Sequence, residues 1–86
     1  MGSMSELLIP DLQALFSEKL MIEVPAPGTD LIESGLLDSL HLVELLLHIE
    51  GTLGCRIPID EIDLDDLRSI ERIARLIAAR AAAGAA

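Results

Sequence analysis

Aromatic and basic residues are scarce in this 86-residue chain, which has one phenylalanine, no tyrosine or tryptophan, and six lysines and arginines against fifteen acids. Because the net charge is −9, no basic patch exists to neutralise phosphates, and this argues against nucleic-acid binding. Residues 1–67 hold fourteen acids and two bases, a net charge of −12, whereas residues 68–86 have a net charge of +3. The acids either keep the protein soluble or attract basic partners.

Cysteine and long apolar runs are almost absent. Cys55 is the only cysteine, so no intramolecular disulfide can form, and a reducing compartment is compatible. Apolar runs such as Leu45–Leu47 are far shorter than the roughly 20 residues of a membrane span. No signal segment opens the chain, and 86 residues leave no room for a deep catalytic cleft. We expect a cytoplasmic domain that is not an enzyme and does not bind membranes.

Apolar residues recur at helical spacing in three stretches, which predicts an all-α fold. Ser5 can cap a first helix, and Ser69 can cap a last helix that has Glu71 in its first turn. The apolar stripes comprise Leu8, Leu12, Leu15, Phe16 and Leu20 in the first helix, and Ile70, Ile73, Ala74 and Ile77 in the last. Residues 60–67 have room for a short helix. The pattern therefore predicts a four-helix bundle of three main helices and one short helix.

A long loop is expected between the first two helices. Pro25-Ala26-Pro27-Gly28 stops any helix, and irregular sequence continues to Leu37. Asp30 can cap a short turn within this stretch. The loop also contains four large apolar residues that must lie against the bundle, namely Leu31, Ile32, Leu36 and Leu37.

The ends of the chain are expected to lie outside the folded domain. Residues 1–3 precede a second methionine, Met4, and are typical of residues added by an expression vector. The alanine-rich residues 81–86 have nothing to pack, so they are predicted to be a disordered tail. The domain itself is expected to span residues 4–80.

The second helix is predicted to begin beside a serine. Gly35 tolerates the backbone angles of a turn, and Asp38 has the side chain to cap free amide groups. Ser39 is then the first helical residue, and an unbroken run of helix-tolerant residues continues to Glu50. The glycines that follow end the helix.

A helical wheel divides the apolar residues of this helix into two faces. One face has Leu42, Leu45, Leu46 and Ile49, and the other has Leu40, Val43 and Leu47, edged by Glu44 and Glu50. The first is a core stripe. The second is either covered by the preceding loop or left partly open beside Ser39, and an exposed apolar patch bordered by acids is typical of a docking surface. His41 and His48 lie between the faces and are expected to face solvent, without binding a metal.

The serine and its neighbours resemble a known attachment motif. Leu37-Asp38-Ser39-Leu40, with a glycine shortly before and a Val-Glu-Leu-rich helix after, resembles the site at which acyl and peptidyl carrier proteins carry phosphopantetheine. The version Gly35-Leu36-Leu37-Asp38-Ser39 is most similar to small stand-alone carriers, including the D-alanyl carrier proteins. The resemblance extends over roughly residues 5–80, because chain length, acidity, helical pattern and long first loop all agree with it.

The resemblance implies a function for each part of the site. Ser39 would carry 4′-phosphopantetheine covalently, beside Asp38, after a phosphopantetheinyl transferase uses coenzyme A and magnesium to attach it. The carrier, a monomer without catalytic residues or a resident metal, would hold cargo as a thioester on the arm. A ligase or acyltransferase would load that cargo. Downstream biosynthetic enzymes would then dock through basic surfaces onto Leu40, Val43, Glu44, Leu47 and Glu50.

One residue departs from the fatty-acid carriers, which usually have an acid two residues after the serine, where this chain has His41. The start of the helix is more similar to aminoacyl or specialised polyketide carriers, and the sequence leaves these cargoes open. A different class of function is an acidic helical adaptor that binds a protein through the same face and carries no prosthetic group. The sequence Asp38-Ser39 favours the carrier.

Overall fold

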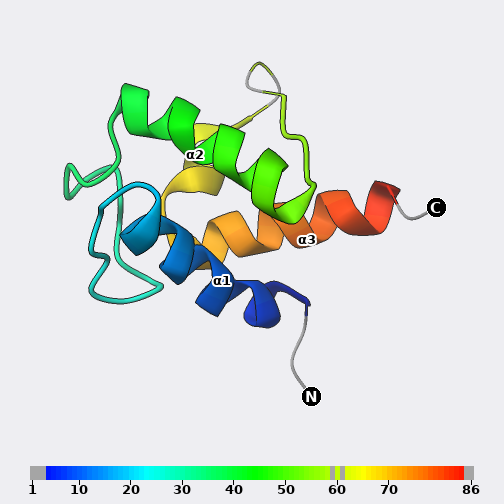
Figure 1. Cartoon of the computed structure of the whole chain (residues 1–86), viewed down its shortest axis with the longest axis horizontal. Helices are drawn as coiled ribbons and strands as arrows, with labels where there is room; N and C mark the ends of the chain where they lie inside the picture. The colour runs from blue at the N-terminus through cyan, green and yellow to red at the C-terminus, as the bar shows by residue number, and fades with distance from the viewer. Residues whose placement is uncertain (1–3, 59, 61, 85–86) are drawn as a thin grey trace.

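The structure is a computed structural model that describes residues 4–58, 60 and 62–84, excluding the side chains of residues 82–84. Its regular elements are helical: α1 (Met4–Glu18), α2 (Ser39–Leu53), the short 3-10 helix η2 (Leu64–Leu67) and α3 (Ile70–Gly84). The predicted all-α fold, with its short helix and long first loop, is confirmed (Figure 1). None of the described helices has the length and apolar content needed to cross a membrane.

Helices α1 and α3 pack against each other, and the buried face of α2 belongs to the same core (Figure 1). The predicted stripe of α3 is almost fully buried, with Ile70, Ile73 and Ala74 at 0% exposure and Ile77 at 2%. The other buried apolar residues are Leu12, Leu15, Phe16, Leu20, Ile22, Leu31, Leu37, Leu45, Leu46, Ile49, Ile57 and Leu67. Since leucine and isoleucine fill most of this core around the single Phe16, the scarcity of aromatic residues does not prevent a single packed cluster.

The long loop between α1 and α2 is fixed to the bundle, as its apolar residues predict. Leu31 and Leu37 are buried, and the Leu31 amide donates a hydrogen bond to the Arg68 carbonyl at 2.6 Å. The Glu71 amide, in the first turn of α3, donates to the Pro27 carbonyl at 3.1 Å. The loop therefore contributes to the core and satisfies part of the exposed backbone at the start of α3.

The observed helix ends differ from the predicted ones in three places. Helix α1 already includes Met4, so Ser5 lies inside it and not before it. Helix α2 continues past Gly51 to Leu53, and Gly54, with a positive φ of 68°, is its left-handed cap. The predicted disordered tail is helical through Gly84, because alanine has the strongest helix propensity. Residues 1–3 and 85–86 lie outside the described residues.

Candidate functional site

Ser39 is the first residue of α2, as predicted, and its side chain is exposed. Asp38 is the cap: its backbone is extended, with φ −99° and ψ −178°, and its Oδ1 accepts the His41 backbone N–H at 2.8 Å. Gly35 lies in the turn that precedes the helix. Its φ of 78° is positive, a conformation that glycine adopts more readily than other residues. The hydroxyl of Ser39 forms no hydrogen bond within the described part of the chain. It is therefore available to an external enzyme.

The electrostatics at this helix start are dominated by Asp38. The hydrogen bond from the His41 backbone N–H is the main cause that lowers the pKa of Asp38 below its ordinary value of 3.8. The His41 side chain adds to the effect, because its Nδ1 lies 2.9 Å from the same Oδ1. An ionised carboxylate makes Nδ1 the proton donor in this bond. Asp38 is thus held as a fixed anion directly before Ser39.

An apolar hollow of about 220 Å³ adjoins the serine. It is lined by Ile32 and Leu37 from the loop, Asp38, Ser39 and Leu42 at the start of α2, and Leu64 of η2. A phosphate attached at Ser39 would lie at a helix N-terminus, where amide groups and the helix dipole favour negative charge. The residues at this position therefore fit a phosphate-linked group with an apolar surface beside it.

The second apolar face of α2 is open to solvent, so the loop does not cover it. Leu40, Val43 and Leu47 are 65%, 44% and 63% exposed. Glu50 is exposed, and Glu44 is half-buried beside the same face. The face begins at Leu40, directly after Ser39, and continues along α2 to Glu50.

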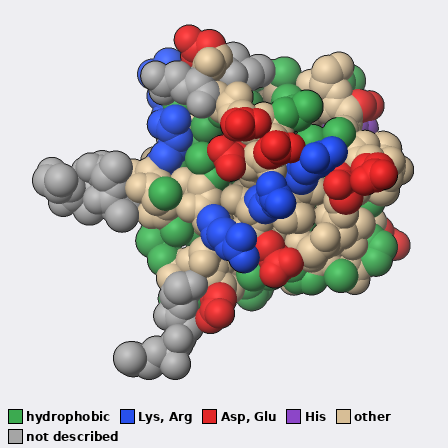
Figure 2. All heavy atoms as spheres, turned by 180° about the vertical axis from the view of Figure 1, so that it is seen from behind, with side chains coloured by type: hydrophobic (Ala, Val, Ile, Leu, Met, Phe, Trp, Pro, Cys, Tyr) green, Lys and Arg blue, Asp and Glu red, His purple; other side chains and the backbone are tan. Residues whose placement is uncertain are grey.

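Basic residues lie on a different helix. Arg72 and Arg75 of α3 are exposed. Arg68, just before α3, forms ion pairs with Asp30 of the loop and Asp65 of η2. Figure 2, which shows the molecule from behind, has blue side chains gathered among red ones on that side. The acids on this side are thus partly neutralised, whereas the described charged residues of α2 are all acidic apart from its two histidines.

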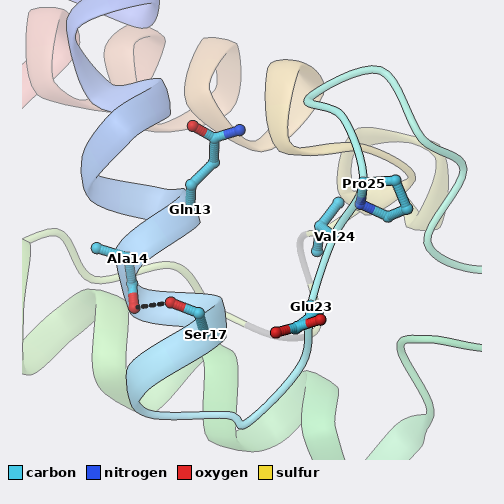
Figure 3. Close-up of a pocket in the computed structure, with 6 residues that line it drawn as sticks. All are labelled: Gln13, Ala14, Ser17, Glu23, Val24 and Pro25. Carbon is cyan, nitrogen blue, oxygen red and sulfur yellow. Dashed lines mark hydrogen bonds between the residues drawn. The ribbon is translucent and has the colours of Figure 1, made fainter.

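Another hollow, of about 590 Å³, lies along α1 and the loop that follows it (Figure 3). Its lining residues are Gln13, Ala14, Ser17, Glu23, Val24 and Pro25. The Ser17 hydroxyl donates a hydrogen bond to the Ala14 carbonyl at 3.3 Å, so it is engaged with its own helix. This hollow has only one ionisable lining residue and includes no part of α2. Ser39 remains the better candidate.

Sequence reasoning missed two features of the site. His41 was expected to face solvent, but it is only half-exposed and bonded to Asp38. An Asp and a His three residues apart at a helix start could have indicated the pair. Leu64 was expected only as part of a short helix, yet it is 55% exposed and closes the hollow beside Ser39. No local pattern predicts that contact, because it joins residues far apart in the sequence.

Comparison with known proteins places this geometry in a family. Residues 10–77 match the family model described as "Phosphopantetheine attachment site". The D-alanyl carrier proteins of Streptococcus pyogenes strains Manfredo and NZ131 are each 41% identical to this chain over 44 residues. That alignment covers 51% of this chain and 56% of each relative, so the chain matches about half the length of these relatives.

The family match spans the loop, the whole of α2 and most of α3, and so includes Asp38, Ser39 and the hollow beside them. The group that gives the family its description is phosphopantetheine. The predicted resemblance is therefore confirmed, and the chain belongs to the phosphopantetheine-binding carrier proteins.

Proposed function

We propose that this protein is a discrete carrier that holds its cargo as a thioester on a phosphopantetheine arm attached to Ser39. The position of Ser39 carries the assignment of the residue. It is exposed at the start of α2, its hydroxyl has no hydrogen bond among the described residues, and it follows the capping Asp38 within the matched span. Ser34 is also exposed, but it lies in a loop turn whose amide donates to the Asp30 carbonyl. Ser69 is 7% exposed and its Oγ accepts the Arg72 amide.

The chain supplies the acceptor, and a phosphopantetheinyl transferase supplies the catalysis. The Ser39 Oγ would attack the pantetheine-bearing phosphate of coenzyme A, forming a phosphodiester and releasing adenosine 3′,5′-bisphosphate. The transferase takes the hydroxyl proton, and its magnesium ion stabilises the phosphates. The N-terminus of α2 favours the attached negative charge. When bound, the arm provides the thiol that forms the thioester, so Cys55 takes no part.

Partner enzymes would dock on the open face of α2. Leu40, Val43 and Leu47 supply apolar contact area beside the attachment point, and Glu44 and Glu50 supply charge that attracts basic surfaces. The partners implied by this surface are the transferase, a cargo-loading ligase or acyltransferase, and the downstream enzyme that receives the cargo. We assign the carrier to the cytoplasm as a monomer, without nucleic acid or membrane as a partner.

The cargo is the finer part of the proposal. The relatives are D-alanyl carrier proteins, and His41 replaces the acid that fatty-acid carriers usually have after the serine. Both features favour an aminoacyl cargo, with a polyketide unit as the second choice. An adaptor that uses the same face without an arm is the alternative from another class, and it predicts that Ser39 is never modified.

The experiment is incubation of the purified protein with coenzyme A, magnesium and a promiscuous phosphopantetheinyl transferase, followed by intact-mass measurement. The wild type and Ser34→Ala should each gain one phosphopantetheine, and Ser39→Ala should gain none. Ser34→Ala is the matched control because it removes another exposed hydroxyl five residues earlier. The carrier is ruled out if the wild type gains no mass, and the assignment to Ser39 fails if Ser39→Ala is modified.

A further inference from the structure

Arg68 contacts two of the segments that line the hollow beside Ser39, the loop and η2. The loop contributes Ile32 and Leu37, and η2 contributes Leu64. Arg68 directly follows η2 and precedes α3. A residue bonded to both segments can therefore set how far apart they lie.

The backbone and the side chain of Arg68 make such bonds. Its carbonyl accepts the Leu31 amide at 2.6 Å. Its Nε lies 3.4 Å from Asp30 Oδ2, and its Nη1 donates to Asp65 Oδ1 at 3.0 Å. The planar guanidinium can address two carboxylates in this way, which a lysine ammonium cannot do with the same fixed geometry. We call these three contacts, to Leu31, Asp30 and Asp65, the Arg68 clamp.

The clamp continues along the loop toward Ser39. Asp30 Oδ1 accepts the amides of Ile32 at 3.1 Å and Glu33 at 2.8 Å, which folds the loop into a turn. The Leu37 amide then donates to the Leu31 carbonyl at 2.9 Å. Through these bonds Arg68 is linked to Leu37, which is buried two residues before Ser39.

The two ion pairs of the clamp are not equivalent. The Asp65 side chain is 62% exposed, so water and salt screen its pair with Arg68. At the other end, Asp30 is 35% exposed, and the Nε of Arg68 is buried without a hydrogen-bond acceptor in good geometry. The Asp30 carboxylate lies 3.4 Å from that buried N–H, although the Arg68 side chain as a whole is 41% exposed. The Asp30 pair is therefore the less screened of the two, and it is the one that joins Arg68 to the loop.

We propose that Arg68 is a positioning residue for Ser39: the clamp holds the loop and η2 at a fixed separation, and so fixes both the segment that delivers Ser39 and the hollow beside it. This role rests on the proposed attachment at Ser39 and adds a residue almost thirty positions away to the attachment site. It explains why a charged side chain at the start of α3 reaches back to the first loop. It also explains why a loop of this length is ordered directly before the serine.

The test compares Arg68→Gln with Arg75→Gln by amide hydrogen exchange. Both variants remove one positive charge from the same region, but Arg75 is exposed and has no ion-pair or hydrogen-bond partner among the described residues. In Arg68→Gln, exchange at the Leu31 and Leu37 amides should rise about tenfold or more, because the loop opens locally. Exchange at Phe16 in the core of α1 should stay unchanged, and Arg75→Gln should resemble the wild type at all three amides.

Loading kinetics supply the second readout. The open face of α2 is intact in Arg68→Gln, so KM for the carrier should be unchanged. The kcat for phosphopantetheine transfer should fall several-fold, because Ser39 is less well placed. Asp30→Asn keeps an oxygen that can accept the two loop amides but removes the ion pair, so it should change both readouts in the same direction by less. If Arg68→Gln does not fold, Asp30→Asn replaces it as the test variant.

Failure of the clamp hypothesis can be told apart from failure of the proposed attachment. A wild type that is never loaded would rule out attachment at Ser39, while exchange at the Leu31 and Leu37 amides would still test the clamp. Unchanged exchange at both amides in Arg68→Gln and Asp30→Asn would overturn the positioning role. Faster exchange at Phe16 by the same factor would also overturn it, because the clamp would then only add to general stability.

Discussion

The two apolar faces of α2 both consist largely of leucine, but one is buried and the other is exposed. Leu45 and Ile49 are fully buried, whereas Leu40 and Leu47 are 65% and 63% exposed. Leu45 and Leu47 are two residues apart, so only the angle around the helix separates them. Hydrophobicity alone does not tell a buried leucine from an exposed one. The direction in which the side chain points, relative to α1 and α3, makes that distinction.

The comparison also explains where the acids lie. Glu44 and Glu50 border the open face, and none of the acids of α2 is among the buried residues. Exposure of several large apolar side chains in a small domain is tolerated here because charge surrounds them. One face therefore stabilises the fold, and the other leaves apolar side chains and acids open to solvent, as the proposed docking requires.

The largest expected effect separates the faces by stability. Leu45→Ala should lower the free energy of unfolding by about 2–5 kcal/mol, because it leaves a cavity in the core. Leu47→Ala, the same change on the open face, should alter it by no more than about 0.5 kcal/mol. Urea unfolding followed by helical circular dichroism measures both. Similar losses in the two variants would mean that the open face also packs against the fold.

The next effect concerns the open face in docking. Val43→Asp and Leu47→Asp should each lower kcat/KM for loading by about tenfold or more at every salt concentration, because they remove short-range apolar contact. Helical circular dichroism should remain that of the wild type, since both residues are exposed. Unaltered kinetics in folded variants would show that partners recognise another surface.

A smaller effect is expected from charge on the same face. Glu44→Arg should slow association a few-fold at low salt and weaken the dependence of loading on ionic strength, since it reduces attraction to a basic partner. Glu18→Arg at the end of α1 is the control, because it makes the same change of charge on a different helix. Equal effects of the two substitutions would point to net charge and not to the face.

The smallest effect concerns Asp38, the N-cap of α2, the helix that carries both faces. The folded-state pKa of Asp38 is lowered, so the stability it contributes is complete above its ordinary pKa of 3.8 and is lost as pH falls through the lowered value. Asparagine also caps a helix but does not titrate. The free energy of unfolding of Asp38→Asn should therefore be close to that of the wild type at neutral pH, and it should decline less than that of the wild type as the pH falls below about 4. Parallel pH profiles for the two proteins would refute this role of Asp38.

The helical parts of the fold follow from local sequence. The spacing of Ile70, Ile73 and Ile77 placed the buried stripe of α3, and Ser69 was correctly expected as its cap. The predicted stop of α2 after Glu50 came too early, because a glycine inside a helix costs only about 1 kcal/mol and Gly51 is therefore tolerated. The second glycine, Gly54, caps the helix as expected. Local propensity thus determines the middle of a helix better than its ends.

The site was predictable to the same extent. Asp38 and Ser39 lie where capping rules put them, and the open face follows from the helical wheel. The wheel could not decide whether the loop covers that face, because this depends on where Leu31 and Leu37 pack. The Arg68 clamp and the position of Leu64 beside the hollow could not be predicted from the sequence either, because both depend on tertiary structure.

The central claim is that Ser39, and no other serine, carries the arm. After treatment with coenzyme A and a phosphopantetheinyl transferase, peptide mapping by tandem mass spectrometry should locate the whole modification on Ser39 at the start of α2. Ser34 in the loop and the buried cap Ser69 should be unmodified. Modification at Ser34 or Ser69, or an unmodified Ser39 in a folded protein, would contradict the account.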